Sequence, residues 1–218
     1  MLILWNGKKT GDKRPNPAND TIVPNASTIL EIFSKKTSEW FLLFPNKSDI
    51  YEGKRLLDMI TTLHYCNFNQ WIWEDIVHSK ECSDNEIVRL KKEIDVSNLE
   101  RYRLIEKIDE YFLTKLKIVQ KDSWENLYIN SQTLAEMIGK LSVQCLKLFY
   151  LGEGLKKISP ESKDALLQQI STIRTQIKYV ASCFDRFSHH LRQGKGYMPF
   201  GEIKVYGILD SKLGKNDD

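Results

Sequence analysis

One stretch of the chain fixes the fold class, because its apolar residues recur every three or four positions. Between residues 84 and 117 these residues are Ile87, Leu90, Ile94, Ile105, Ile108 and Phe112. Such spacing places them on one face of an α-helix, which must bury that face against other elements. Similar patterns span residues 52–79, 131–151 and 161–192. The sequence therefore predicts an all-α bundle.

The helix ends divide the bundle into two antiparallel hairpins, residues 52–117 and 131–192. Ser83 and Glu86 have the spacing of a capping box, and Thr133 or Ser131 can cap the third long helix. We expect that helix to end at Gly152 and Gly154. We expect the last helix to begin at Ser159-Pro160-Glu161 and to end at Gln193-Gly194.

The two hairpins resemble a repeat. A shift of about 76 residues superimposes Ser83 on Ser159, Leu90 on Leu166, Ile94 on Ile170, Ile108 on Phe184 and Asp109 on Asp185. A cap, an apolar stripe and an acidic residue then match in one register. Stacking two such hairpins would bury apolar faces that neither can hide alone.

The sequence pattern at the two ends of the chain differs from that of the predicted bundle. Residues 1–45 are predicted to form an arm, irregular over residues 6–26, followed by a short helix that Asn25-Ala26-Ser27-Thr28 could cap and that runs to Phe44. Residues 46–218 are predicted to form the bundle. Its tail, residues 194–218, is Gly-rich and contains a short extended piece at residues 202–209.

Charge, cysteine content and the length of apolar runs limit the partners and the compartment that we expect. The net charge is +3 with mixed basic and acidic residues, so no nucleic-acid partner is expected. Four cysteines without a CxxC motif predict free thiols in the cytoplasm and neither a metal nor a cofactor. The longest uncharged apolar run, residues 40–44, is too short for a membrane span, and the first residues lack a signal-peptide pattern.

Polar residues interrupt the apolar stripes of the first hairpin. His64, Asn67, Trp71 and Glu74 continue the stripe that begins at Ile60, and Asn98 and Arg101 fall between Ile94 and Ile105. Side chains three and four residues apart share a helix face. These polar groups should therefore point toward a neighbouring helix.

A turn near Cys82 sets which residues of the two helices lie opposite each other. Asn67 should face Asn98, His64 should face Arg101, and Glu74 or Asp75 should lie near Lys91, each to within about one helical turn, ~5 Å. The cluster has two interpretations. It is either a polar network that fixes helix pairing or a ligand or catalytic site.

These residues resemble a family, domain-of-unknown-function family 4254. The resemblance rests on HYCNFNQWIWED at residues 64–75, LKKEID at residues 90–95, Asn98, Arg101 and IEKID at residues 105–109. It extends less closely over residues 133–151 and to Lys204 and Tyr206. Four places depart from the family pattern: Gly139 replaces an acidic residue, Tyr150 a His, Tyr102-Arg103 an Asn-Asp pair and Gly207-Ile208 a polar pair.

The resemblance implies a bacterial helical protein without an established activity, whose genes often lie beside glycosyltransferase genes for lipopolysaccharide and other surface glycans. One hypothesis is an accessory protein of that assembly, with a glycosyltransferase or a second copy as partner. The other is a small enzyme or binding protein for an anionic sugar-type ligand. Its catalytic residues would be His64, Glu74 and Arg101, and its ligand-binding residues Asn67, Trp71, Asp75 and Asn98. Whether the protein is an enzyme stays open.

Overall fold

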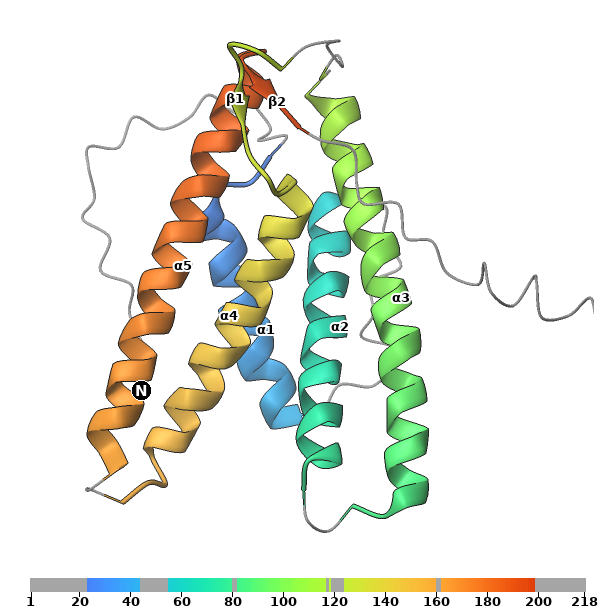
Figure 1. Cartoon of the computed structure of the whole chain (residues 1–218), viewed down its shortest axis with the longest axis vertical. Helices are drawn as coiled ribbons and strands as arrows, with labels where there is room; N and C mark the ends of the chain where they lie inside the picture. Colours follow the sequence, from blue (N-terminus) through green and yellow to red (C-terminus); the bar gives the residue numbers. More distant parts are fainter. Residues whose placement is uncertain are drawn as a thin grey trace, which may run out of the picture.

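The computed structural model describes residues 23–43, 55–79, 82–116, 118, 124–159 and 162–198. These residues form α1 (Ala26–Leu43), α2 (Leu56–Val77), α3 (Asp84–Lys115), β1 (Tyr128–Ile129), α4 (Leu134–Leu155), α5 (Lys163–Arg192) and β2 (Gly196–Tyr197) (Figure 1). The predicted all-α bundle is confirmed. No helix in the described part of the chain is long and apolar enough to cross a membrane.

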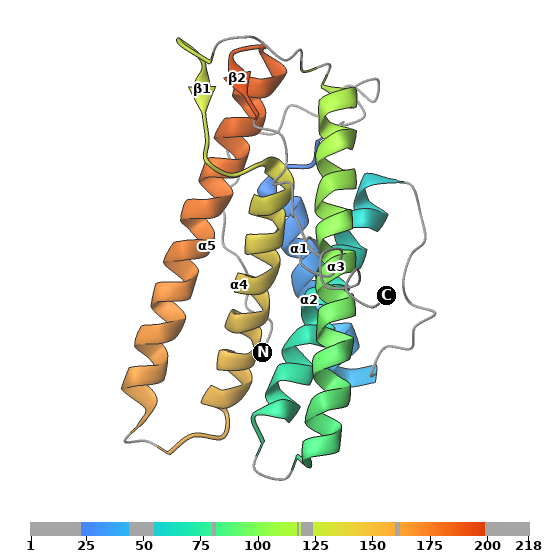
Figure 2. The same cartoon turned by 45° about the vertical axis from the view of Figure 1, so that its right-hand side comes forward.

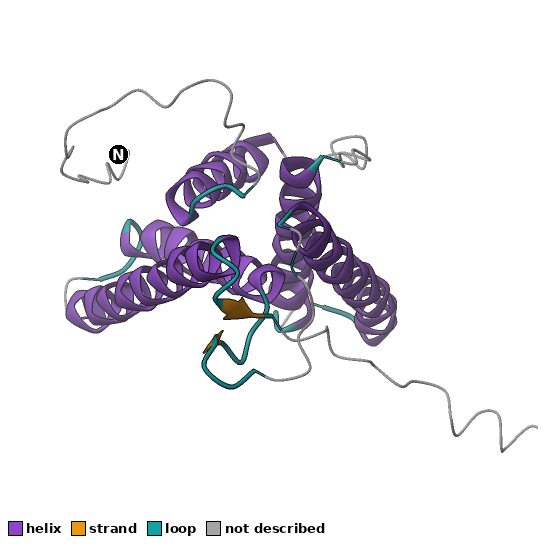
Figure 3. Ribbon diagram, turned by 90° about the horizontal axis from the view of Figure 1, so that it is seen from above, coloured by secondary structure: helices purple, strands orange, loops and turns teal. Residues whose placement is uncertain are grey.

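The helices form two antiparallel hairpins, α2 with α3 and α4 with α5. Figures 1 and 2 show both connecting turns at one end of the bundle and the two strands at the other. Seen from above, the hairpins meet at an angle instead of forming parallel layers (Figure 3). α4 contacts both α2 and α3, so it joins the hairpins.

Helix α1 belongs to the same core as the hairpins. It contacts α2, α4 and α5, and Ile29 and Phe33 are fully buried in the main apolar cluster. The predicted cap is confirmed, since the Asn25 side-chain oxygen accepts from the backbone N of Thr28 at 2.9 Å. The irregular arm was expected to reach residue 26, but Val23 and Ala26 are buried. The packed core therefore starts at residue 23 at the latest, while residues 1–22 lie outside the described residues.

Helix α2 lies at the centre of the bundle. Every residue from Ile60 to Phe68 is buried, because α1, α3 and α4 surround this stretch. Polar side chains within it cannot reach water and must bond to neighbouring helices. The apolar pattern alone does not indicate which neighbour each of them meets.

The ends of the second hairpin agree only in part with expectation. Thr133 caps α4 in a complete capping box with Glu136. Gly194, at φ 67°, follows α5, where a glycine tolerates the left-handed backbone. The expected stop at Gly152 and Gly154 is wrong: both lie inside α4, which ends at Leu155. The short extended piece found is β2, which pairs in parallel with β1, whereas residues 202–209 lie outside the described part.

The proposed repeat is reflected in two equivalent aspartates. Asp109 on α3 accepts from the backbone N of Ala135, at the start of α4, at 3.0 Å. Asp185 on α5 accepts from the backbone N of Ala26, at the start of α1, at 2.8 Å. Each hairpin therefore uses the same position of its second helix to cap the first turn of another helix.

We expect Asp109→Ala to lower the free energy of unfolding by about 1–2 kcal/mol and Asp185→Ala by about 0.5–1 kcal/mol, because each removes an N-terminal cap and Asp185 is the more exposed. Urea denaturation at pH 7 measures both effects. Asp95→Ala, at an exposed position of α3, is the matched control. Equal losses for Asp109→Ala and Asp95→Ala would refute the capping role.

Candidate functional site

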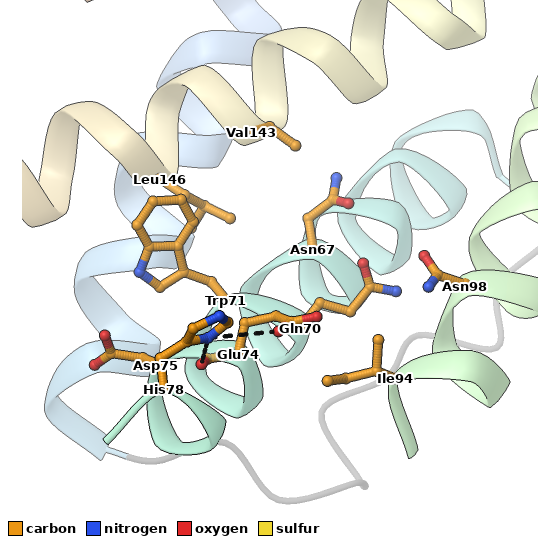
Figure 4. Close-up of a pocket in the computed structure, with 10 residues that line it drawn as sticks. All are labelled: Asn67, Gln70, Trp71, Glu74, Asp75, His78, Ile94, Asn98, Val143 and Leu146. Atoms are coloured by element: carbon orange, nitrogen blue, oxygen red, sulfur yellow. Dashed lines mark hydrogen bonds and ion pairs between the residues drawn. The ribbon is translucent and has the colours of Figure 1, made fainter. Parts of the chain in front are cut away.

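A groove of about 490 Å³ opens between α2, α3 and α4 (Figure 4). Helix α2 provides one wall with five polar or aromatic side chains and a histidine at its end, while α3 and α4 provide mainly apolar contacts opposite. The lining residues are Asn67, Gln70, Trp71, Glu74, Asp75, His78, Ile94, Asn98, Val143 and Leu146.

Five of the seven predicted site residues line this groove. They are Asn67, Trp71, Glu74, Asp75 and Asn98. The helical spacing of α2 explains why they gather, since residues 67, 71, 74 and 78 fall on one face. The other two members of the predicted cluster, His64 and Arg101, do not border the groove.

The predicted position of Lys91 beside Glu74 or Asp75 is confirmed, whereas the amide of Asn67, expected to face Asn98, bonds to Ser142 on α4. The Lys91 ammonium lies 2.8 Å from a Glu74 carboxylate oxygen, across the hairpin. The Gln70 side-chain nitrogen donates to the Ser97 hydroxyl at 3.0 Å. Both contacts join residues about equally distant from the turn, as an antiparallel pair requires.

His64, however, does not face Arg101, and this prediction is wrong. The Nδ1 of His64 lies 2.7 Å from the Ser142 hydroxyl, and its Nε2 lies 2.8 Å from the Thr37 hydroxyl and 3.1 Å from the Phe33 carbonyl. Those partners belong to α1 and α4, so the ring points away from α3. The error lies in the direction of the side chain around the axis of α2.

The environment of His64 keeps the ring neutral. The side chain is fully buried and stacks on Phe33 with 4.3 Å between ring centroids. Burial lowers the pKa of His64 to about 3, despite the opposing effect of the Phe33 carbonyl. Because a carbonyl only accepts, the network assigns the proton to Nε2 and leaves Nδ1 to accept from Ser142.

Asn67 joins the same network while also bordering the groove. Its side-chain nitrogen donates to the Ser142 hydroxyl at 2.8 Å. Ser142 can thus accept from Asn67 and donate to His64 at once. This arrangement anchors the Asn67 amide between the groove and the buried histidine.

Arg101 lies on α3, one turn beyond Asn98, and is half-buried. Its guanidinium carbon is 4.7 Å from the centre of the Tyr102 ring, and its buried Nε has no hydrogen-bond partner among the described residues. The predicted convergence of a histidine, a carboxylate and this guanidinium on one layer is therefore not formed.

His78 and Gln70 border the groove but were not predicted as ligand-binding residues. His78 extends the α2 stripe four residues beyond Glu74, so continuing the same spacing by one turn would have found it. Its Nδ1 donates to the Glu74 carbonyl at 2.7 Å and lies 3.8 Å from the Glu74 carboxylate. Gln70 is held by Ser97, as described above.

Two lining residues offer free polar groups to a ligand. Asn98 forms no side-chain hydrogen bond, and Asp75 no ion pair, with any described residue. Glu74, by contrast, already binds Lys91. The Asp75 charge and burial together raise the pKa of the Tyr150 hydroxyl, burial being the larger cause.

Trp71, which lines the groove, belongs to an aromatic pair. The rings of Trp71 and Tyr150 stack with 5.3 Å between centroids and 15° between planes. Phe41 contacts Tyr150 edge-on at 6.0 Å, which supports the pair from α1. The Trp71 indole is therefore held in place as a flat apolar surface beside the polar lining.

The described residues contain no group of three or more His, Cys, Asp or Glu side chains that could hold a metal ion. The four cysteines are unpaired. Burial raises the pKa of the Cys66 thiol to about 11 and that of Cys145 to about 12, which disfavours the reactive thiolate at both positions.

A family model described as "Protein of unknown function (DUF4254)" matches residues 57–200. This range covers both hairpins and every residue that lines the groove. Neither the search of curated proteins nor the search of solved structures found a match.

Proposed function

Because this chain belongs to the DUF4254 family of proteins of unknown function, its role has to be inferred from the groove, and we propose that it binds a sugar-type ligand there. The observation that carries the proposal is the combination of a fixed indole, Trp71, with free amide and carboxylate groups on Asn98 and Asp75. The C–H face of a sugar ring packs on an aromatic ring, while its hydroxyls pair with amides and carboxylates.

The lining favours a neutral sugar over an anionic one. It contains two carboxylates and no Arg or Lys, and the nearby Lys91 already pairs with Glu74. Arg101, which the hypothesis of an anionic sugar-type ligand counted among its catalytic residues, is not part of the lining. An anionic ligand would therefore meet a carboxylate, Asp75, without a compensating charge.

Binding accounts for this site better than catalysis by His64, Glu74 and Arg101. Of these three, only Glu74 borders the groove, and it is engaged with Lys91. We place the binding role in the cytoplasm, in an accessory protein of bacterial cell-surface polysaccharide or lipopolysaccharide assembly. The gene neighbourhood implied by the family resemblance fits a sugar ligand and a glycosyltransferase as partner.

We expect Asn98→Ala to weaken sugar binding by about 3- to 10-fold, because it removes one or two hydrogen bonds of ordinary strength. The probes are glucose, methyl β-galactoside and N-acetylglucosamine, with glucuronate as the anionic counterpart of glucose. Saturation-transfer NMR and calorimetry at millimolar ligand measure binding. Glucose should bind more tightly than glucuronate.

Arg101→Met is the control, since it lies on the same helix one turn from Asn98 but outside the groove. It should bind as the wild type does. If none of the four probes binds, or if Asn98→Ala and Arg101→Met weaken binding equally, the sugar-binding proposal is wrong.

A further inference from the structure

A second hollow of about 660 Å³ lies between α4 and α5 and adjoins the groove. Trp71 lines both hollows, so its indole stands at their common boundary. Tyr150, which stacks on Trp71, lines the second hollow. The aromatic pair therefore stands between two adjacent spaces that the two hairpins form.

The second hollow has its own set of polar groups. Gln168, Gln169 and Thr172 line it from α5, Lys147 lines it from α4, and Leu151 and Leu166 provide apolar surface. Like the first groove, the second hollow therefore combines amide and other polar groups with apolar side chains. These groups can serve hydroxyls and C–H faces of a further sugar ring.

The sizes of the two hollows indicate the length of the ligand. Each falls in the range of about 300–1,000 Å³ that is typical of pockets for a single small ligand. A monosaccharide held in the groove would leave the second hollow empty. A longer ligand that extends beyond Trp71 would occupy both the groove and the second hollow.

We propose that the site takes an oligosaccharide whose adjacent rings lie on either side of Trp71, one in the groove and the next in the second hollow. This inference rests on the sugar-binding proposal and adds the size of the ligand to it. Trp71 and Tyr150 present an aromatic surface at the junction, while α2 and α3 supply polar groups in the groove and α4 and α5 supply them in the second hollow.

The test compares sugars of increasing length: glucose, maltose and maltotriose, and N-acetylglucosamine, chitobiose and chitotriose. We expect the dissociation constant to fall at least tenfold from the monosaccharide to the longer members of at least one series. Thr172→Arg should abolish this gain and leave monosaccharide affinity unchanged, because the new side chain fills the second hollow and not the groove.

Thr175→Arg is the matched control. Thr172 and Thr175 both lie exposed on α5, and each hydroxyl donates to a backbone carbonyl four residues earlier at 3.0 Å, but only Thr172 lines the hollow. The control should keep the full gain.

The results distinguish a failure of the oligosaccharide inference from a failure of the sugar-binding proposal. If monosaccharides bind but neither series gains affinity with length, or if Thr172→Arg retains the gain, the oligosaccharide inference is overturned and the groove proposal stands. If no sugar of either series binds, the groove proposal itself fails.

Discussion

Replacing Ser142 with alanine should lower the free energy of unfolding by about 2–4 kcal/mol. The Ser142 side chain is fully buried, and its hydroxyl contacts both His64 Nδ1, at 2.7 Å, and the Asn67 amide, at 2.8 Å. Alanine leaves both groups without this partner inside the bundle. A buried polar group left unpaired costs about 1–3 kcal/mol.

Urea denaturation of wild type and Ser142→Ala measures the effect. Ser188→Ala is the control, because Ser188 is likewise buried in a helix but forms no side-chain hydrogen bond with a described residue. It should lose less than about 1 kcal/mol. If the two variants lose equal amounts, Ser142 does not hold the network together.

The second large effect is a loss of folding stability as the pH falls. The pKa of His64 is lowered from 6.5 to about 3 by burial, so the unfolded chain takes up a proton that the folded protein rejects. Stability from this residue is present above pH 6.5 and is lost as the pH falls toward 3. Between pH 6.5 and 4.5 we expect a loss on the order of 2–3 kcal/mol.

His64→Gln should be less stable at pH 7.5, because it disturbs the network, but should lack this part of the acid-induced loss. Chemical denaturation at several pH values gives both slopes. His78→Gln, at the exposed end of the same helix, should keep the wild-type slope. A His64→Gln slope equal to that of the wild type would show that His64 does not cause the acid sensitivity.

Asp109 changes stability with pH in the opposite direction to His64. The effect of His64 is therefore measured as the difference in pH dependence between wild type and His64→Gln. Burial raises its pKa from 3.8 to about 6, with hydrogen bonds from Thr133 and Ala135 opposing the shift. The folded protein therefore holds this proton more tightly than the unfolded chain, and Asp109 adds stability as the pH falls through 6. Its contribution cancels when His64→Gln is compared with wild type.

The sequence predicted positions along the helices better than directions around them. The turn near Cys82 was enough to place Glu74 or Asp75 near Lys91, because distance from a turn sets the height of each residue in an antiparallel pair, and Glu74 is the residue that pairs with it. The caps at Asn25 and Thr133 were also predictable from the sequence, since each side chain accepts a hydrogen bond from a backbone N only three residues later.

Directions failed on α2 because three helices surround its first half. A polar stripe indicates that the side chains form hydrogen bonds to a neighbouring helix, but it does not indicate which one. For His64 the neighbours are α3 on one side and α1 with α4 on the other. Two of the His64 partners, the Thr37 hydroxyl and the Phe33 carbonyl, come from α1, and the spacing of residues within α2 carries no information about that helix. Trp71, Glu74 and Asp75 were still placed on the groove, because the part of α2 beyond Phe68 is less enclosed by other helices.

The paired aspartate caps link the end of the described bundle back to its beginning. Asp109 holds the start of the helix that comes next in the chain, whereas Asp185 holds the start of α1, so α1 stands in space as the successor of α5. Val23 and Met198 accordingly belong to one core, and Arg192 donates to the Val23 carbonyl at 2.8 Å. The described bundle is therefore suited to circular permutation, with residues 198 and 23 joined by a linker and new ends opened in the turn between α4 and α5.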